Sequence, residues 1–155
     1  MAEVLPDWSP SVIEDSKILI IGASGGLGTA LVNMLLQGSE CCIGAHGSSK
    51  TCEYDDVRVT PLKKSFYSEN DCVDVVDEFV EIVGGIDALV CLNGAIHFSG
   101  HWMNIPAAMW ERDIDLNLNQ TFYLARAAMK EMKREGKGGR IILNGTESAL
   151  HGGSA

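Results

Sequence analysis

Hydrophobic and polar positions along the chain follow two alternating periods. Short runs rich in apolar and β-branched residues lie at residues 17–21, 41–45, 57–60, 86–92 and 140–143. Runs of this kind are typical of strands that are buried on both faces of a parallel sheet. The run at 17–21 is the most uniformly apolar of them, and we expect it to be the central strand.

Between these runs, apolar residues return every three or four positions, as they do on one face of a helix. The pattern predicts helices over residues 27–37 and 68–83, and a longer one over 106–135. Ser68 and Asp71 resemble a capping box at the start of the second helix, and glycines follow the end of each helix. For the long helix we expect an inner face that consists of Ile114, Leu118, Phe122, Ala125, Met129 and Met132.

Strand and helix alternate throughout this pattern. Because crossover connections between parallel strands are almost always right-handed, the alternation predicts an α/β fold, a Rossmann-like doubly wound parallel sheet with helices on both faces. We expect about five strands in a single domain over residues 17–155, incomplete at its C-terminal side and without internal repeats. Residues 1–16 are acidic and carry two prolines, so we expect a loosely ordered lead-in.

Composition and charge narrow the range of partners. The 155 residues are 46% hydrophobic and 21% charged, which is sufficient for one packed core. The formal net charge of −9 would repel a phosphate backbone, so we expect no nucleic-acid partner. No apolar run approaches the roughly 18 residues that cross a bilayer, so we expect no membrane-spanning segment. One group of cations falls at the expected end of the long helix, as solvated surface: Lys130, Lys133, Arg134, Lys137 and Arg140.

The cysteines and histidines do not predict a metal site. The five cysteines are an odd set without metal-ligand spacing, and Cys41 and Cys42 are adjacent and poorly placed to pair with each other. Reduced thiols in the cytoplasm fit this set best. His97 and His101 have the i, i+4 spacing of a helical metal site, but the Asn, Gly and Ser residues around them favour a solvated or substrate-binding loop.

A glycine-rich turn carries the first chemical signal. The segment Gly22-Ala-Ser-Gly-Gly-Leu-Gly28 lies between the first predicted strand and the first predicted helix. Backbone amides at a helix N-terminus hold pyrophosphates well, so dinucleotide binding is the functional interpretation and a purely structural turn is the alternative. Gly22 would permit the tight turn, Gly26 the approach of the phosphates, and Gly28 the packing of helix on strand. The candidate cofactor-binding residues here are Gly22, Ser24, Gly25, Gly26, Leu27 and Gly28.

The spacing of this turn resembles that of one enzyme family. The pattern G-x-G-x-x-G is not met, because Leu31 occupies its last position, and the spacing is G-x-x-x-G-x-G instead. Residues 21–28 are similar to the Thr-Gly-Ala-Ser-x-Gly-Ile-Gly loop of the short-chain dehydrogenase/reductase family, with Ile21 in place of Thr. Because of Gly25, the loop equally fits the G-x-x-G-x-x-G of the family's longer, sugar-nucleotide-modifying branch.

Downstream residues favour the shorter branch, whose members include proteins like the 3-oxoacyl-ACP reductases. Residues 110–122 resemble its W-x-x-x-I-D-x-N-L-x-x-x-F frame, which places a functional asparagine at Asn117. In the family this asparagine bends the helix and holds a water that relays protons to the active-site lysine. Residues 139–142 resemble the strand before the catalytic serine, whose position aligns with Thr146, and a threonine in a simple turn is the alternative.

The resemblance implies an NAD(P)-binding domain and hydride transfer between the nicotinamide and a small-molecule carbonyl or alcohol. One departure from the family follows the fourth strand, where the family has Asn-Asn-Ala-Gly. This chain has Cys91, Leu92, Asn93 and Gly94 there. The backbone of the last three residues could still contact the adenosine ribose, but the first asparagine, which stabilises the sheet in the family, is absent.

Two further departures concern the adenosine half of the cofactor. The acidic residue that receives the adenine amine after the third strand is absent, with Lys63, Ser65 and Phe66 in that vicinity, which predicts an altered affinity for adenine. The second strand ends near His46 without the carboxylate that binds the ribose hydroxyls of NAD, which favours NADP over NAD. His46 or Lys50 could meet a 2′-phosphate, or each is a simple loop residue.

The family's proton-donating Tyr-x-x-x-Lys pair does not occur in residues 1–155, whose tyrosines are Tyr54, Tyr67 and Tyr123. We therefore expect the N-terminal part of a family member, truncated before that pair and with negligible reductase activity alone. Its last strand would be an unpaired edge, which predicts marginal stability or self-association into a homo-oligomer. A non-catalytic dinucleotide-binding or regulatory module and an inactive gene fragment are the alternatives. A methyltransferase is disfavoured, because His46 stands where its acidic residue would end the second strand.

Overall fold

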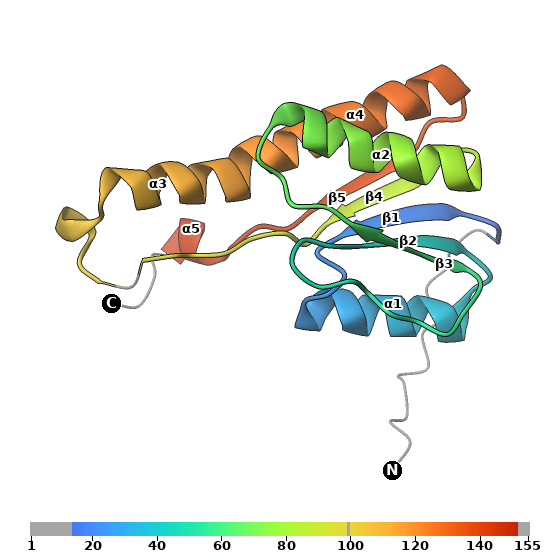
Figure 1. The fold of residues 1–155 in the computed structure, drawn as a ribbon, viewed down its shortest axis with the longest axis horizontal. Coiled ribbons are helices and arrows are strands. Elements are labelled where there is room, and N and C mark those ends of the chain that lie inside the picture. The colour runs from blue at the N-terminus through green and yellow to red at the C-terminus, as the bar shows by residue number, and fades with distance from the viewer. Residues whose placement is uncertain (1–13, 99, 152–155) are drawn as a thin grey trace, which may run out of the picture.

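Five parallel strands form one open sheet in the computed structural model, which describes residues 14–98 and 100–151 (Figure 1). The strands are β1 (Lys17–Ile21), β2 (Cys42–Gly47), β3 (Val59–Lys63), β4 (Ala88–Cys91) and β5 (Arg140–Leu143), in the order β3-β2-β1-β4-β5. The chain builds outward from β1 to β3 and then crosses to β4 and β5 on the other side. This confirms the Rossmann-like doubly wound sheet and its central first strand. Residues 1–13 of the predicted lead-in and residues 152–155 lie outside the described part.

Helices cover both faces of this sheet (Figure 1). They are α1 (Gly26–Gly38), α2 (Glu69–Val83), the 3₁₀ turn η1 (Trp102–Asn104), α3 (Ala107–Ile114), the π-helical turn η2 (Asp115–Asn119), α4 (Gln120–Glu135) and α5 (Ser148–His151). α1 packs on one face, and α2 and α4 pack side by side on the other. α3 continues the line of α4 beyond the sheet, so that it forms an arm with η1 and α5.

Local sequence sets the helix ends as predicted. The Ser68 hydroxyl accepts a hydrogen bond from the Asp71 amide at 3.3 Å and donates one to the Asp71 carboxylate at 2.9 Å. Gly84 and Gly136 end α2 and α4 with φ angles of 79° and 72°, which are left-handed values that favour glycine. The predicted capping box and glycine stops are therefore confirmed.

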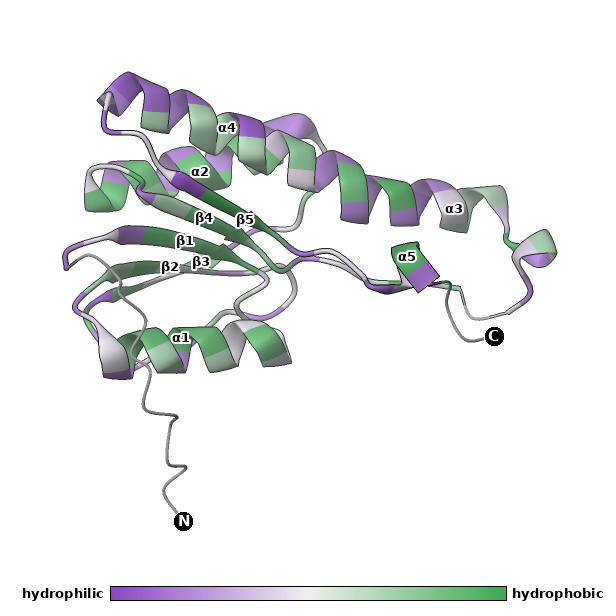
Figure 2. Ribbon diagram, turned by 180° about the vertical axis from the view of Figure 1, so that it is seen from behind, coloured by the Kyte–Doolittle hydropathy of each residue, from purple (hydrophilic) through white to green (hydrophobic). Residues whose placement is uncertain are grey.

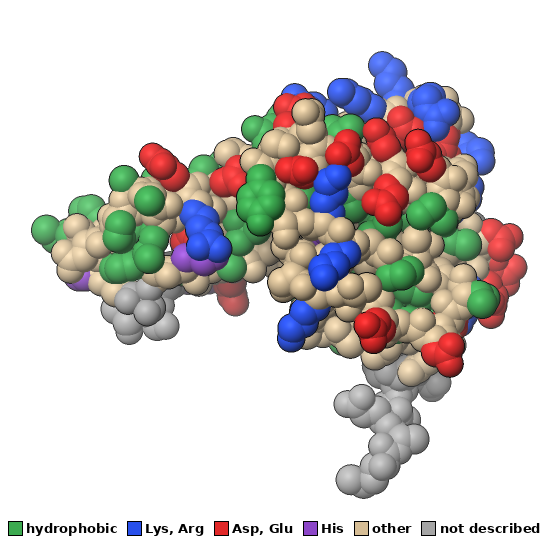
Figure 3. All heavy atoms as spheres, in the orientation of Figure 1, with side chains coloured by type: hydrophobic (Ala, Val, Ile, Leu, Met, Phe, Trp, Pro, Cys, Tyr) green, Lys and Arg blue, Asp and Glu red, His purple; other side chains and the backbone are tan. Residues whose placement is uncertain are grey.

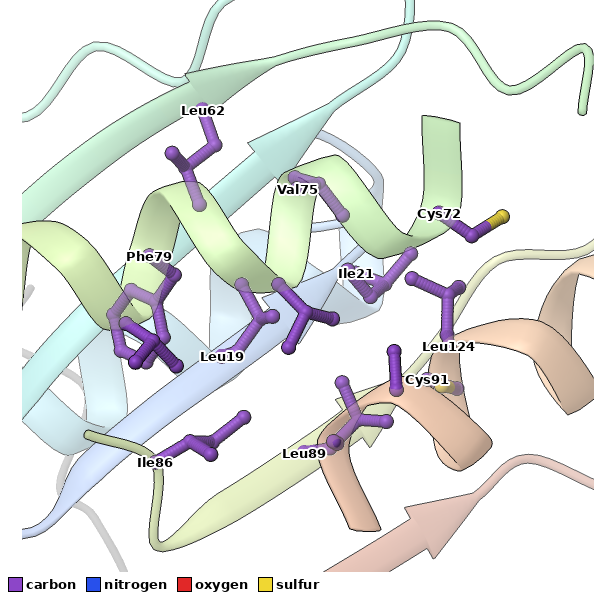
Figure 4. Close-up of a cluster of buried hydrophobic side chains, with 14 of the residues drawn as sticks. Leu19, Ile21, Leu62, Cys72, Val75, Phe79, Ile86, Leu89, Cys91 and Leu124 are labelled. Atoms are coloured by element: carbon purple, nitrogen blue, oxygen red, sulfur yellow. The ribbon is translucent and has the colours of Figure 1, made fainter. Parts of the chain in front are cut away.

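The core forms one layer on each face of the sheet. Leu19 of β1 and Leu89 of β4 pack under α2 and α4, in the layer that also buries Phe79 (Figure 4). Ile20 and Val90, their neighbours along the strands, pack against α1 on the opposite face. Figure 2 shows hydrophobic strands between helices that carry both hydrophobic and polar residues. Burial on both faces explains why these strands are almost continuously apolar.

The inner face of the long helix differs from the prediction. Leu118, Phe122 and Met129, expected inside, are 60%, 54% and 51% exposed, and Ile114 and Ala125 are only partly buried. The buried residues of α4 are Gln120, Leu124, Ala127, Ala128 and Met132. Alanines permit close packing but give a weak apolar signal, so the larger residues dominated the pattern. The π-helical turn η2 also adds a residue to one turn, which breaks the 3.6-residue phase on which the prediction relied.

Surface features at the two ends of the sheet agree with the sequence. β5 pairs only with β4 within the described residues and forms one edge, as predicted, and Ile142 and Leu143 on it are exposed. Lys133 and Arg134 lie in the last turn of α4, where cations complement the helix dipole. Figure 3 shows Lys and Arg side chains gathered at that end of the molecule, which supports reading the basic stretch as solvated surface.

Candidate dinucleotide-binding site

A cavity of about 700 Å³ opens beyond the carboxyl ends of β1, β2 and β4. The chain leaves β1 toward β2 and later returns to β4 on the other side, so the loops diverge here and leave a crevice. Dinucleotides bind at such a switch point in open α/β sheets. The candidate residues that line the cavity are Gly22, Ser24, Gly25, His46, Leu92, Asn93 and Gly94.

The turn after β1 needs glycine at two of its positions. Gly22 has a φ of 83°, and a Cβ there would lie 3.0 Å from the carbonyl of Leu92. A Cβ on Gly28 would lie 2.3 Å from the carbonyl oxygen of Gly22, so any side chain would push the helix off the turn. Gly26 differs, because a Cβ there would meet no atom within 4 Å. The open space beside Gly26 is where a phosphate could approach the backbone.

The N-terminus of α1 presents free backbone amides to this space. Its N-cap, Gly25, provides no side-chain cap, and the first amide bonded back to the turn is that of Thr29, at 2.8 Å from the Gly25 carbonyl. Within the described residues, the amides of Gly26, Leu27 and Gly28 have no acceptor, as expected for the first turn of a helix. Amides at this end carry about half a positive charge and suit an anion. The turn therefore fits a pyrophosphate.

His46 lines the cavity, although its side chain is almost entirely buried, with 2% of the residue exposed. Its Nε2 is 2.7 Å from the carbonyl oxygen of Lys64, which can only accept, so Nε2 carries the proton. Burial lowers the pKa of the ring from 6.5, partly opposed by that hydrogen bond. The ring is thus neutral and stacks on Phe66 with centroids 4.6 Å apart, while Nδ1 is buried without a partner in the described chain. The backbone carbonyl of His46 accepts a hydrogen bond from the Ala23 amide at 2.8 Å, which joins β2 to the glycine turn.

The loop after β4 lines the cavity and begins in direct contact with the glycine turn. The Leu92 amide donates to the carbonyl of Ile21 at 2.9 Å, which sets the loop against the end of β1. The Asn93 side chain donates to the carbonyl of Leu116 at 3.1 Å and to the Thr121 hydroxyl at 3.3 Å. These contacts attach the loop to the long helix and leave its backbone to line the cavity.

Asn117 lies in η2, where the long helix widens, and fastens the same loop. Its Oδ1 accepts from the Ala95 amide at 3.1 Å, and its Nδ2 donates to the Ala95 carbonyl at 2.8 Å. Nδ2 also donates to the carbonyl of Asp113 at 2.8 Å, one turn earlier in the helix. A Cβ on Gly94 would lie 3.0 Å from Oδ1. The side chain of Asn117 therefore joins the helix and the loop.

Thr146 is not brought into the cavity. It lies beyond β5 and is exposed, and its hydroxyl accepts from the Ser148 amide at 3.2 Å at the start of α5. Among the described residues that line the cavity, Thr146 is absent, whereas Asn117 touches the cavity loop without lining the cavity itself.

Sequence reasoning missed the groups that the long helix contributes. Arg112, Asp115 and Gln120 line the cavity. The His97 ring and amide bind the Asp113 carboxylate, and this histidine holds the pKa of Asp113 below its ordinary value. Asp113 and Asp115 are both present in the sequence motif, but only the position of the helix beside the loop reveals what their carboxylates contact.

Cysteine and metal chemistry are not evident in the described part of the chain. All five cysteines are free, and burial raises the pKa of the Cys72 and Cys91 thiols to about 12. No group of three His, Cys, Asp or Glu among the described residues is arranged to hold a metal ion. His97 and His101 lie in a loop and at the start of η1, as their polar neighbours predict. No described helix is both long and apolar enough to span a bilayer.

Comparison with protein families matches residues 16–153 to short chain dehydrogenase. The matched region contains the glycine turn, the loop after β4 and Asn117. The chain belongs to this family. Two relatives are the L-rhamnose 1-dehydrogenase (NAD(P)(+)) of Sphingomonas sp. (strain SKA58), 29% identical over 150 residues, and the dehydrogenase/reductase SDR family member 4 of Bos taurus, 29% identical over 143. The alignments cover 92% and 84% of this chain but 59% and 50% of those relatives, so the chain spans little more than half their length.

Solved structures of this family share the fold. A short chain dehydrogenase from Leptospira borgpetersenii with bound NAD⁺ has a TM-score of 0.79 over 91% of this chain and 55% of its own, at 19% identity. The NADH-dependent reductase A1-R′ complexed with NAD has a TM-score of 0.71 over 91% of this chain and 63% of its own, at 23% identity. At these identities the likeness establishes the architecture alone.

Proposed function

We propose that this chain is the cofactor-binding part of an NAD(P)-dependent oxidoreductase that transfers hydride between a nicotinamide and a small carbonyl or alcohol. The observation that carries the proposal is the α1 N-terminus, where the amides of Gly26, Leu27 and Gly28 have no acceptor among the described residues and open space lies beside Gly26. Membership of the short-chain dehydrogenase family supplies the reaction class. When bound, the nicotinamide supplies or receives the hydride.

The residues of the chain bind and orient the cofactor. The amides of Gly26, Leu27 and Gly28 hold the pyrophosphate, and the Ser24 hydroxyl and Gly25 border it from the cavity wall. In the loop after β4, the residues Leu92, Asn93 and Gly94 line the same cavity and offer their backbone to the adenosine ribose, supported by the contact between Leu92 and Ile21.

Two residues serve the reacting end of the site. Asn117 positions the loop that carries Ala95 and, by the family resemblance, holds a water in a proton relay. Thr146 polarises the substrate carbonyl through its hydroxyl, which in the free chain accepts from Ser148. When substrate binds, the Thr146 hydroxyl has to give up its bond with Ser148 and bond to the substrate carbonyl instead. Because Thr146 is exposed beyond the end of β5, its hydroxyl is free to make this exchange.

Between the two nicotinamide cofactors, we propose NADP as the preferred one. β2 ends without a carboxylate, so nothing at this point repels a 2′-phosphate. The neutral, buried His46 is poorly suited to hold the phosphate, because it offers neither charge nor an exposed donor. The hydroxyls of Ser48, Ser49 and Ser65 line this side of the cavity and are the donors that we assign to it.

Residues 1–155 are proposed to bind the cofactor with negligible turnover of their own. None of their three tyrosines stands in a Tyr-x-x-x-Lys pair, and the loss of a general acid typically costs about 10² to 10⁴ in rate. The five free cysteines suit a reducing compartment such as the cytoplasm.

Calorimetric titration of the purified chain with NADPH tests the proposal. We expect saturable one-to-one binding, with NADPH tighter than NADH and no oxidation of either by a panel of carbonyl compounds. Absence of saturable binding to a chain that melts cooperatively would refute the cofactor assignment. Tighter binding of NADH would overturn only the cofactor preference, and measurable turnover only the claim of inactivity.

A further inference from the structure

The adenine end of the cavity lacks an acceptor on the strand side. The segment after β3 brings Ser65, Phe66 and Tyr67 to the cavity wall, and none of them is acidic. Glu69 and Asp71 are the next carboxylates along the chain, and both are occupied: Glu69 pairs with Arg126, and Asp71 accepts from the Tyr67 amide and the Ser68 hydroxyl at the start of α2. An adenine placed beside β3 would therefore find no carboxylate on this wall for its exocyclic amine.

The opposite wall provides such a carboxylate. Asp115, the first residue of η2, is the one acidic residue among the described residues that line the cavity. Gln120, five positions later, lines the same cavity because the π-helical turn brings residues five apart onto one side. Phe66 and these two residues meet at one place, since the Gln120 amide donates to the Phe66 carbonyl at 3.3 Å and to the Asp115 carboxylate at 2.8 Å.

Asp115 is held in place and retains accepting capacity. Its Oδ2 accepts a hydrogen bond from the side chain of Gln120, which is 7% exposed, and its Oδ1 is 3.4 Å from the side-chain Nδ2 of Asn119. A carboxylate offers about four lone-pair positions, so both oxygens can accept again. Among the described residues no ion pair joins Asp115 to a cationic side chain, and the hydrogen bonds that a carboxylate accepts are stronger than those of a neutral acceptor.

We propose that Asp115, braced by Gln120, recognises the exocyclic amine of the adenine ring and replaces the missing acidic residue after β3. This inference rests on the proposed dinucleotide binding and assigns a base-reading residue within that site. The base would lie between the segment of Ser65 and Phe66 and the turn of Asp115 and Leu116. Recognition then comes from the long helix rather than from the sheet.

Replacement of adenine by hypoxanthine tests the assignment directly, because it exchanges the amine donor for a carbonyl acceptor. Binding of NADPH and of its hypoxanthine analogue is measured by quenching of protein fluorescence and by calorimetry. For the unaltered chain we expect the adenine form to bind about tenfold more tightly. In Asp115→Asn the side-chain amide can donate to the hypoxanthine carbonyl, so the two affinities should come within about twofold of each other.

Asp113→Asn is the matched control, since Asp113 lies on the same helical arm but binds His97 and does not line the cavity. It should keep the tenfold preference. Equal binding of both analogues by the unaltered chain, or an unchanged preference in Asp115→Asn, would overturn the inference while leaving dinucleotide binding intact. If neither analogue binds the unaltered chain, the proposed function itself fails. Should Asp115→Asn not fold, Asp115→Glu decides, because it must retain a preference for adenine.

Discussion

The side chain of Asn117 pairs with the main chain of Ala95 in both directions, accepting from its amide at 3.1 Å and donating to its carbonyl at 2.8 Å. The side-chain amide of Asn117 thus makes the pair of hydrogen bonds that the main chain of a neighbouring β-strand would make, like one rung of a β-ladder. It joins the widened turn of the long helix to the loop that forms one wall of the proposed cofactor site.

Removal of this rung should loosen the loop. Asn117→Ala loses the two bonds to Ala95 and the bond to Asp113, so we expect a loss of about 1–2 kcal/mol in unfolding free energy and weaker NADPH binding. Hydrogen exchange at the amides of residues 93–97 should accelerate. Asn119→Ala, in the same turn but with one contact at 3.4 Å, to Asp115, is the control for the unfolding free energy and the hydrogen exchange and should change neither. Unaltered exchange in Asn117→Ala would contradict the role of the rung.

Gly28→Ala should impair folding rather than binding alone. The added Cβ would lie 2.3 Å from the Gly22 carbonyl oxygen and 2.5 Å from the Ala23 Cα, both of which are backbone atoms that cannot rotate away. Overpacking of this kind typically costs about 1–3 kcal/mol. Chemical denaturation should show the loss as a lower midpoint, and a midpoint equal to that of the unaltered chain would contradict the close packing of α1 on the turn.

Gly26→Ala should weaken cofactor binding without lowering the stability of the fold. Its Cβ meets no atom within 4 Å, so the variant should fold as well as the unaltered chain. The same Cβ would occupy the space through which a phosphate approaches, so we expect NADPH affinity to fall about tenfold or more. Normal affinity in Gly26→Ala would place the pyrophosphate elsewhere, even if the chain binds NADPH.

The buried ring of His46 should make stability depend on pH. Burial lowers its pKa in the folded chain, whereas in the unfolded chain it titrates near 6.5. Below pH 6.5 the unfolded chain therefore binds a proton that the folded chain refuses, and the stability contributed by the neutral ring is lost as the pH falls. Thermal melts of the unaltered chain and of His46→Gln, whose amide can still donate to the Lys64 carbonyl, check this point. The unaltered chain should lose more stability between about pH 7.5 and about pH 5.5, and equal losses would argue against a neutral His46.

The sheet and the glycine turn were predictable because their signals are local. β1 and β5 are both short apolar runs in the sequence, and β1 is buried on both faces, so both strands could be predicted from local sequence. The position of Gly28 between strand and helix likewise defines the close approach that excludes a Cβ. The burial of His46 could not be predicted, because it depends on Phe66, twenty positions away, stacking on its ring. The same holds for Asp115, whose direction depends on a π-helical turn that no periodicity of 3.6 residues reveals.

The apolar stripe formed by Leu118, Phe122 and Met129 should make the chain self-associate. These side chains lie on the outer side of the long helix and are more than half exposed. The Phe122 ring contacts two neighbours on its own helix, Arg126, whose guanidinium lies 5.0 Å from the ring centre, and Tyr123, in an edge-on arrangement. Their spacing of four and seven residues places them on one helical face, and exposed apolar faces of this kind favour association. Sedimentation velocity should show mass increasing with concentration.

Substitution of the stripe should abolish that increase while leaving the core untouched. Leu118→Lys with Met129→Lys removes the two unpartnered apolar side chains and adds cations to an acidic protein, so the doubly substituted chain should remain monomeric over about a hundredfold range of concentration. Val57→Lys, which alters a fully exposed apolar residue between β2 and β3, is the control and should still associate. If the unaltered chain is monomeric throughout, the stripe does not drive association. If both altered chains associate equally, the exposed edge β5 becomes the better candidate, since its open backbone groups are unchanged in either.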